Sequence, residues 1–327
     1  MDLNPISILA SVSRNRMIMP FYHAINDRPP VHLKHLYHIF TEEQFEADLD
    51  FLLKHFQPIS IGDLLAFVKN SRPLPKRCFL LTFDDGLREF GEVAFPILKK
   101  KGIPSALFVN PYFVDNKELF FRLKSSILIE AAQQNKIAWE HVNEVTGKRI
   151  DHFKEGINFL KSVSYPNRQV LDDLAPVFEV SFEEYRKNNR PYLTFDELRY
   201  LQQQGVFVGG HSLDHPLFNQ LDVNGQLDQI RKSMTWIQEN LLPAIPIFSF
   251  PFTDFGVTQE LFQTISTDHP LNPALTFGCA GMKQERISTH WQRIPMEDKP
   301  RTAKQVIYQQ YLYYLAKALL KKNTIKR

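Results

Sequence analysis

Two hydrophobic patterns alternate along the chain. Short apolar runs, typical of buried parallel strands, are separated by longer segments with the three-to-four-residue spacing of amphipathic helices. Strands are predicted at 17–22, 78–83, 105–109, 206–208, 247–250, 275–279 and 293–295. Helices are predicted from Thr41 and at 61–70, 87–101, 194–204, 225–242, 258–266 and 302–322. This alternation indicates a parallel α/β architecture.

Capping boxes locate the starts of two of these helices. Thr41 is followed three residues later by Gln44, and Thr194 is followed by Glu197. In such a pair each side chain bonds to the backbone amide of the other residue. We therefore expect helices to begin directly after Thr41 and Thr194.

Residues 115–190 interrupt the alternation. Apolar positions from Leu119 to Ala131 predict one helix, and the rest is polar, partly helical sequence with no clear strand. We interpret this stretch as a helical insertion in a single domain that spans 1–327. Its role stays open between a lid over a site and inert packing.

Composition narrows the class of protein. The 327 residues are 43% hydrophobic, enough for a sizeable core, and α/β barrels reach this length undivided. The net charge is only +3 and basic residues are interleaved with acids, which argues against a nucleic-acid binder. Cys78 and Cys279 lie in apolar runs, so we interpret them as buried thiols in a reducing compartment rather than a disulfide.

No stretch is apolar and long enough to be a membrane span. The run at 6–19 is interrupted by Arg14 and Arg16, and it lacks the order of charge, apolar core and cleavage site of a signal peptide. We therefore expect a cytoplasmic protein.

The first chemical feature is the end of the strand that starts at Cys78. The run C-F-L-L-T-F leads directly into Asp84, Asp85 and Gly86. Two adjacent carboxylates at the carboxyl edge of a sheet are costly to bury unpaired, so a positive group is expected nearby. The alternative is a turn in which these carboxylates cap the following helix.

The second feature follows the strand at 206–208. His211 and His215 come after two glycines, and their spacing of four places both imidazoles on one face of a helical turn, where they can share a metal ion. Together with Asp85 they make three ligands. A fourth position open to water is the pattern of catalytic rather than structural metal sites.

These two motifs resemble those of a known family. T-F-D-D-G at 82–86, followed by H-S-L-D-H at 211–215, is similar to the first two motifs of the polysaccharide deacetylases, the NodB-homology domain of carbohydrate esterase family four. F-Y-H-A-I-N-D at 21–27 and I-S-I-G-D-L-L at 59–65 resemble the N-terminal part of such chains. The resemblance covers most of the length, except the insertion and the terminal helix.

The resemblance implies a distorted (β/α) barrel of the NodB-homology type that binds one divalent metal ion, usually Zn²⁺. Asp85, His211 and His215 would be the ligands, and Asp84 the general base. Ser212 would fix the loop through a hydrogen bond. The implied reaction is metal-dependent hydrolysis of N-acetyl groups on N-acetylhexosamine residues of a polysaccharide or glycan precursor, which releases acetate.

The family's third motif is matched by F-S-F-P-F at 248–252. The resemblance implies that the backbone amide of Phe252 donates to the oxyanion. The motif often carries an arginine that pairs with the catalytic base, but Ser249 stands at that position. Arg293, in the sequence R-I-P-M-E, is the candidate to replace it.

The general acid has no match, because the family's Leu-x-His motif is absent. By position, His290 and His23 are the candidates, and we take His290 as the first choice. Each also has a purely structural interpretation: His290 as a residue of a polar loop, and His23 as an anchor of the barrel floor. Asp254 is a further ionisable group near the third motif, or a solvated loop residue.

Two other functions stay open on the same barrel. One is a non-catalytic carbohydrate-binding or scaffold protein, and the other is an O-acetyl esterase or other amidohydrolase. An acetylated amino-sugar glycan or a lipid-linked precursor is the expected partner.

The terminal segment combines an apolar face at 302–322 with Lys321, Lys322, Lys326 and Arg327. One interpretation is a helix docked on the barrel. The other is a basic amphipathic helix in peripheral contact with the inner membrane, which would suit an enzyme that acts on lipid-linked glycans.

Overall fold

The computed structural model describes residues 5–135, 139–241, 245–267 and 269–327. Within these ranges no helix has the length and apolar character that a membrane span requires. Both cysteines are free thiols, with Cys78 buried and Cys279 half-buried.

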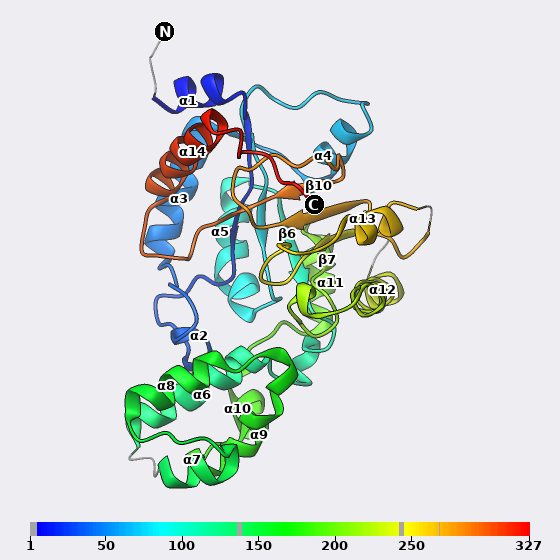
Figure 1. Cartoon of the computed structure of the whole chain (residues 1–327). Coiled ribbons are helices and arrows are strands. Elements are labelled where there is room, and N and C mark those ends of the chain that lie inside the picture. Colours follow the sequence, from blue (N-terminus) through cyan, green and yellow to red (C-terminus); the bar gives the residue numbers. More distant parts are fainter. Residues whose placement is uncertain (1–4, 136–138, 242–244, 268) are drawn as a thin grey trace.

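The centre of the molecule is an eight-stranded parallel sheet in the order β10-β9-β8-β7-β6-β5-β2-β11 (Figure 1). Its strands, in chain order, are β2 (Pro20–Tyr22), β5 (Leu81–Phe83), β6 (Ser105–Val109), β7 (Phe207–Gly210), β8 (Ile247–Ser249), β9 (Leu275–Gly278), β10 (His290–Gln292) and β11 (Ile294–Pro295). Only Arg293 separates β10 from β11, and these strands form the two ends of the order. One segment therefore pairs with β9 on one side and with β2 on the other, and the sheet nearly closes into a barrel. The predicted parallel α/β barrel is confirmed.

A small second sheet extends two barrel strands at their amino ends. It contains β1 (Met17–Ile18), β3 (Gln57–Pro58) and β4 (Cys78–Phe79) in the parallel order β1-β4-β3. Each of β1 and β4 continues after one residue into β2 and β5, so the predicted strands at 17–22 and 78–83 are each divided in two. The sequence pattern did not predict β3.

Helices cover the outside of the barrel. They are α3 (Glu42–His55), α4 (Ile61–Val68), α5 (Phe95–Lys101), α11 (Phe195–Gln203), α12 (Val223–Asn240) and α13 (Gln259–Ile265). Both predicted capping boxes, at Thr41 and Thr194, are present. The helix predicted from Leu87 begins later, with a π turn at Phe90–Ala94, because Leu87 and Arg88 bond instead to the segment around Tyr192.

The described residues of the insertion form helices joined by short irregular segments, and they contain no strand. Its helices are α6 (Phe121–Gln134), α7 (Trp139–Thr146), α8 (Phe153–Ser162), α9 (Gln169–Leu174) and α10 (Phe182–Asn189), with short 3₁₀ turns at Val114–Asn116, Tyr165–Asn167 and Ala175–Phe178. Figure 1 shows them as a green lobe below the barrel. Apolar residues of α6, α8 and α9 form a separate core, in which Leu128, Leu160 and Leu171 are fully buried.

The terminal helix α14 (Ala303–Leu319) docks on the protein. It packs against α1 (Pro5–Ser13) and α3, and it buries Val306, Ile307 and Tyr311. Leu312, Leu319 and Leu320 on its other face remain exposed. The short helices α1 and α2 (Val31–Lys34) and the 3₁₀ turn at Phe218–Gln220 were not predicted.

Candidate metal centre and active site

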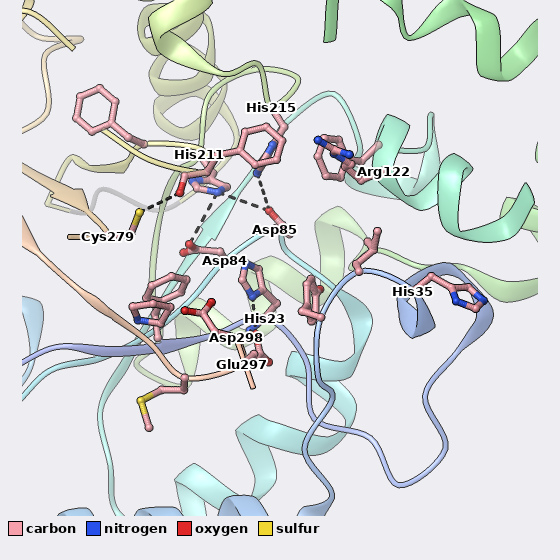
Figure 2. Close-up of a pocket in the computed structure, with 18 of the residues that line it drawn as sticks. His23, His35, Asp84, Asp85, Arg122, His211, His215, Cys279, Glu297 and Asp298 are labelled. Atoms are coloured by element: carbon pink, nitrogen blue, oxygen red, sulfur yellow. Dashed lines mark hydrogen bonds and ion pairs between the residues drawn. The ribbon is translucent and has the colours of Figure 1, made fainter. Parts of the chain in front are cut away.

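The residues that carry the sequence motifs meet in one cavity of about 600 Å³ (Figure 2). Because the strands are parallel, the segments that follow β2, β5, β7, β8 and β11 open at the same edge of the barrel. The cavity is lined by Asp84, Asp85, His211, His215, Phe252, Arg293 and His23, among others.

A sharp turn after β5 directs the two aspartates. Asp85 and Gly86 have positive φ angles of 72° and 66°, a conformation that glycine adopts without strain. A Cβ atom at Gly86 would also lie 3.0 Å from the side chain of Val109. The first helical turn after this point has Glu89 as its N-cap, without a side-chain cap, so the interpretation of Asp84 and Asp85 as helix caps is wrong.

Asp85, His211 and His215 are buried together, and their candidate ligand atoms lie within 4.8 Å of one another. Oδ1 of Asp85 lies 3.2 Å from Nε2 of His215 and 3.5 Å from Nε2 of His211. Among the described residues this oxygen has no hydrogen-bond partner of good geometry. A buried carboxylate that faces two imidazoles without a proper hydrogen bond has the donor set of a Zn²⁺ site with an open position.

The two histidines are not on a helical turn, contrary to the expectation from their spacing. Residues 211–215 form an irregular loop in which Ser212 and His215 have φ angles of 68° and 63°. Oγ of Ser212 accepts a hydrogen bond from the backbone N–H of His215 at 3.0 Å, and the Asn110 side chain donates to that oxygen at 3.3 Å. These bonds fold the loop back, and the two ring centroids lie 4.8 Å apart.

A backbone contact orients His211. Its Nδ1 donates to the carbonyl oxygen of Ser249 at 2.8 Å, which leaves the lone pair of Nε2 directed at Asp85. Burial lowers the pKa of His211 to about 4, so the ring is neutral at pH 7, the form that binds metal. The rings of Phe120 and Phe252 pack on His215, with centroids 4.3 and 4.6 Å away. The three residues therefore fit a divalent ion.

Arg293 provides the positive partner of Asp84. Its Nη1 and Nη2 each donate to one carboxylate oxygen at 2.7 Å, and both residues are buried. Nη2 also donates to Oγ of Ser249 at 2.5 Å, and Nη1 to Oγ1 of Thr82 at 3.0 Å. Burial alone would raise the pKa of Asp84, but the Arg293 guanidinium and His211 outweigh it, and the pKa is lowered. Arg293 thus occupies the role of the missing motif arginine, and Ser249 supports it.

His23 lines the same cavity and is paired with Glu297, a residue that the sequence did not single out. Nδ1 of His23 lies 2.5 Å from Oε2 of Glu297, and that oxygen also accepts the backbone N–H of His23 at 2.9 Å. The Tyr37 ring stacks on the imidazole at 4.5 Å. Burial by itself lowers the pKa of His23, but Glu297 outweighs it and raises the pKa to about 9. His23 therefore presents a protonated imidazole at neutral pH.

His290 lies elsewhere. It is a buried residue of β10, not of a polar loop, and its Nε2 lies 3.1 Å from Oδ2 of Asp254. Arg327 also pairs with Asp254, so this carboxylate belongs to a buried network and is not solvated. Neither His290 nor Asp254 is among the residues that line the cavity. The sequence signal for β10 is weak, because the strand contains only three residues.

The fold and the site together define an α/β barrel with a buried Asp-His-His cluster at the carboxyl ends of its strands. Residues 71–176 match the family model described as Polysaccharide deacetylase. That range includes Asp84 and Asp85 and ends within the insertion. A search of curated proteins found no match.

Solved structures of similar fold include proteins that are described as deacetylases. The chain is similar to the Streptococcus pyogenes deacetylase PplD in complex with acetate, with a TM-score of 0.56, 15% identity and coverage of 89% of this chain and 97% of that one. It is also similar to IcaB from Ammonifex degensii (TM-score 0.53, 16% identity, 90% and 97% covered). A third is a de-N-acetylase from Aggregatibacter actinomycetemcomitans (TM-score 0.55, 13% identity, 90% and 100% covered). The fold is therefore the NodB-type barrel, and the resemblance to the polysaccharide deacetylases is confirmed.

Proposed function

We propose that this protein is a metal-dependent deacetylase that hydrolyses the N-acetyl groups of N-acetylhexosamine residues in a glycan or glycan precursor and releases acetate. One observation supports this most directly. A single cavity brings a three-ligand cluster together with an ionised carboxylate, Asp84, and a protonated imidazole, His23. Amide hydrolysis needs a base for the attacking water and an acid for the departing amine.

A divalent ion, most simply Zn²⁺, held by Asp85, His211 and His215 would polarise the acetamide carbonyl and lower the pKa of the attacking water. The protein's own groups do the rest. Asp84 takes a proton from the water as its oxygen bonds to the carbonyl carbon. Arg293 keeps that carboxylate ionised and fixes its orientation through two hydrogen bonds.

The backbone N–H of Phe252 is proposed to stabilise the charge that develops on the carbonyl oxygen. Phe252 has a φ of 57°, unusual for a residue with a side chain, and its ring lies against His215. His23 then donates its proton to the amide nitrogen as the C–N bond breaks, so that a neutral amine and acetic acid leave. The acid loses its proton to water to give acetate, and exchange with water returns Asp84 and His23 to their starting charges. The role of proton donor falls to His23 rather than to His290, because His23 alone of the two lines the cavity.

The His23–Glu297 pair also favours turnover over the two alternative functions. A protein that only binds or displays glycans has no need of a half-buried histidine held protonated. An O-acetyl ester has a better leaving group than an amide and depends less on a positioned acid. The same cavity would nevertheless admit an ester, so both classes of substrate belong in the test.

Acetate release from N-acetylated and O-acetylated sugars, measured with the metal-loaded protein, tests the proposal. We expect about one divalent ion per chain and release from the N-acetylated sugars. Asp84→Asn should reduce this release by a factor of about 10²–10⁴ because the base is lost. The matched control is Asp228→Asn, which changes an exposed aspartate of α12 that pairs with Lys232. Metal and glycan binding without any acetate release would instead establish the non-catalytic function.

Peripheral membrane contact through α14 is a separate part of the proposal. Leu312, Leu319 and Leu320 are 58%, 88% and 64% exposed and recur at the spacing of one helical face. Residues 302–327 contain no aspartate or glutamate, and Lys321 and Lys322 follow the exposed leucines. An apolar stripe with flanking lysines suits an anionic lipid surface, where lipid-linked glycans are found.

A further inference from the structure

The helical insertion forms one wall of the catalytic cavity. Helix α6 contributes Arg122, Ser125 and Ile129, and Lys161 comes from the end of α8. Figure 2 shows Arg122 on the side of the cavity where His215 lies. The insertion therefore reaches the space that a substrate of Asp84 and the metal ligands would occupy, and it is not inert packing.

Arg122 is a cation that has no carboxylate partner among the described residues. Its guanidinium carbon lies 5.2 Å from the centre of the Phe121 ring and 5.9 Å from that of Phe252, and Nη1 donates to the carbonyl oxygen of Lys161. Among the described residues, no carboxylate lies within ion-pair distance of Arg122 or Lys161. The contrast with its neighbours is clear: Arg149, Arg168 and Arg190 each pair with an aspartate or glutamate.

This isolation has an energetic consequence. Arg122 is half-buried, so it has lost part of its hydration, and burial lowers its pKa from the usual value. A guanidinium in this state gains more from an anion than one in open water, because the local dielectric constant is lower. Its planar fork also matches two oxygens of a carboxylate or phosphate at once.

The acids of the cavity do not satisfy this charge. Asp84 is paired with Arg293, and Glu297 with His23. Asp298 also lines the cavity, but among the described residues it makes no ion pair with Arg122. Asp85 faces the two metal-ligand histidines. Phe252 connects Arg122 to the reaction centre, because its ring contacts His215 on one side and the guanidinium on the other.

We infer that Arg122, assisted by Lys161, forms a subsite for an anionic group carried by the substrate beside the acetylated sugar. The shared chemistry is a carboxylate or a phosphate. The preferred substrate is then an acidic glycan or a glycosyl phosphate, not a neutral homopolymer. This inference rests on the proposed function, since it places the anion next to the scissile acetamide.

Binding of deacetylated sugars to the metal-loaded protein tests the subsite without turnover. The probes are glucosamine 1-phosphate, muramic acid and glucosamine, measured by calorimetry. We expect at least one of the two anionic probes to bind about 10-fold or more tightly than glucosamine, as a charge-assisted bidentate contact should. Which of them binds more tightly identifies phosphate or carboxylate as the source of the anion.

The variant Arg122→Gln should remove that preference, and Arg122→Lys should retain only part of it, because lysine keeps the charge but not the fork. Arg149→Gln is the matched control, an exposed arginine of the same insertion that is absent from the cavity lining. Equal binding of all three probes, binding of none, or an unchanged preference in Arg122→Gln would each overturn the inference.

Kinetics separate this inference from the proposed function. The ratio of kcat/KM for N-acetylglucosamine 1-phosphate or N-acetylmuramic acid to that for neutral N-acetylglucosamine oligomers should fall about 10-fold or more in Arg122→Gln, mainly through KM. If neutral and anionic substrates are deacetylated with equal kcat/KM, the anionic subsite is refuted and the proposed function is not. If the protein binds the anionic sugars selectively but releases acetate from no substrate, the deacetylase function is refuted and the anionic subsite is not.

Discussion

Replacing Arg293 with methionine should destabilise the protein strongly, because it leaves Asp84 buried without its partner. Arg293 donates two bonds to Asp84 at 2.7 Å, and others to Thr82, Ser249 and Gly278. Removal of one member of a buried ion pair costs about 3–5 kcal/mol. With an m value of about 3 kcal/mol/M in urea, the unfolding midpoint should fall by about 1–1.7 M.

The double variant Asp84→Asn/Arg293→Met separates the ion pair from the general loss of packing. Because neither charge remains, it should be more stable than Arg293→Met by a few kcal/mol, on the order of the cost of the unpaired charge. Urea unfolding followed by circular dichroism in the presence of a chelator measures all four proteins. If the two single losses simply add in the double variant, the pair makes no coupled contribution and the argument is refuted.

The loss of stability in Arg293→Met should change with pH in a defined direction. In the wild type the folded-state pKa of Asp84 is lowered, so its contribution is present above the unfolded pKa and is lost as the pH falls through the folded value. In Arg293→Met the strongest of the interactions that oppose burial is lost, so the pKa of Asp84 is higher than in the wild type. The stability deficit of the variant should therefore shrink as the pH is lowered from neutral, because the unpaired Asp84 takes up a proton more readily than the unfolded chain does.

Two further predictions concern the acid and the terminal helix. Because Glu297 raises the pKa of His23 to about 9, kcat/KM should fall as the pH rises through that value. The variant His23→Gln should lose this alkaline decrease, and its rate should be lower by a factor of about 10²–10⁴. The control His290→Gln, outside the cavity, should keep the alkaline decrease. If both variants keep it, His23 is not the acid. In co-sedimentation with vesicles, the protein should bind phosphatidylglycerol but not phosphatidylcholine, and Leu319→Gln/Leu320→Gln should abolish the binding. The exposed Tyr200→Gln on α11 is the control, and equal sedimentation of both mutants contradicts the membrane contact.

The sequence predicted those features that depend on neighbouring residues. The apolar run before Asp84 locates a strand, and its end locates the carboxyl edge of the sheet, because strand direction and turn chemistry are local properties. The Thr41 and Thr194 capping boxes are confirmed for the same reason. The spacing of His211 and His215 predicted their proximity but not its cause, since positive φ angles at residues other than glycine leave no mark in a hydrophobic pattern.

Long-range pairs were harder to predict: Arg293 was only a candidate partner of Asp84, and the pair of His23 with Glu297 was not predicted. His23 and Glu297 are 274 residues apart, and Arg293 and Asp84 are 209 apart. Such pairs depend on which segment closes the barrel, and the closing strands β10 and β11 are too short to show a clear period. His290 was therefore placed in a loop, and the contribution of Arg122 to the cavity wall was not foreseen.

The segment that closes the barrel supplies the partners of both proton-transfer groups. Between β10 and β11, Arg293 turns inward to Asp84, and directly after β11, Glu297 reaches His23 and the backbone of Ala24. In the same segment the N–H of Ile294 donates to the carbonyl oxygen of Met19, just before β2, and the N–H of Met296 donates to that of Phe21 in β2. Closure of the barrel and the charge states of the proposed base and acid are thus set by one stretch of chain. An arginine at position 249 would pair with Asp84 from strand β8. Arg293 lies instead between the two closing strands, so the ionisation of Asp84 depends on closure of the barrel.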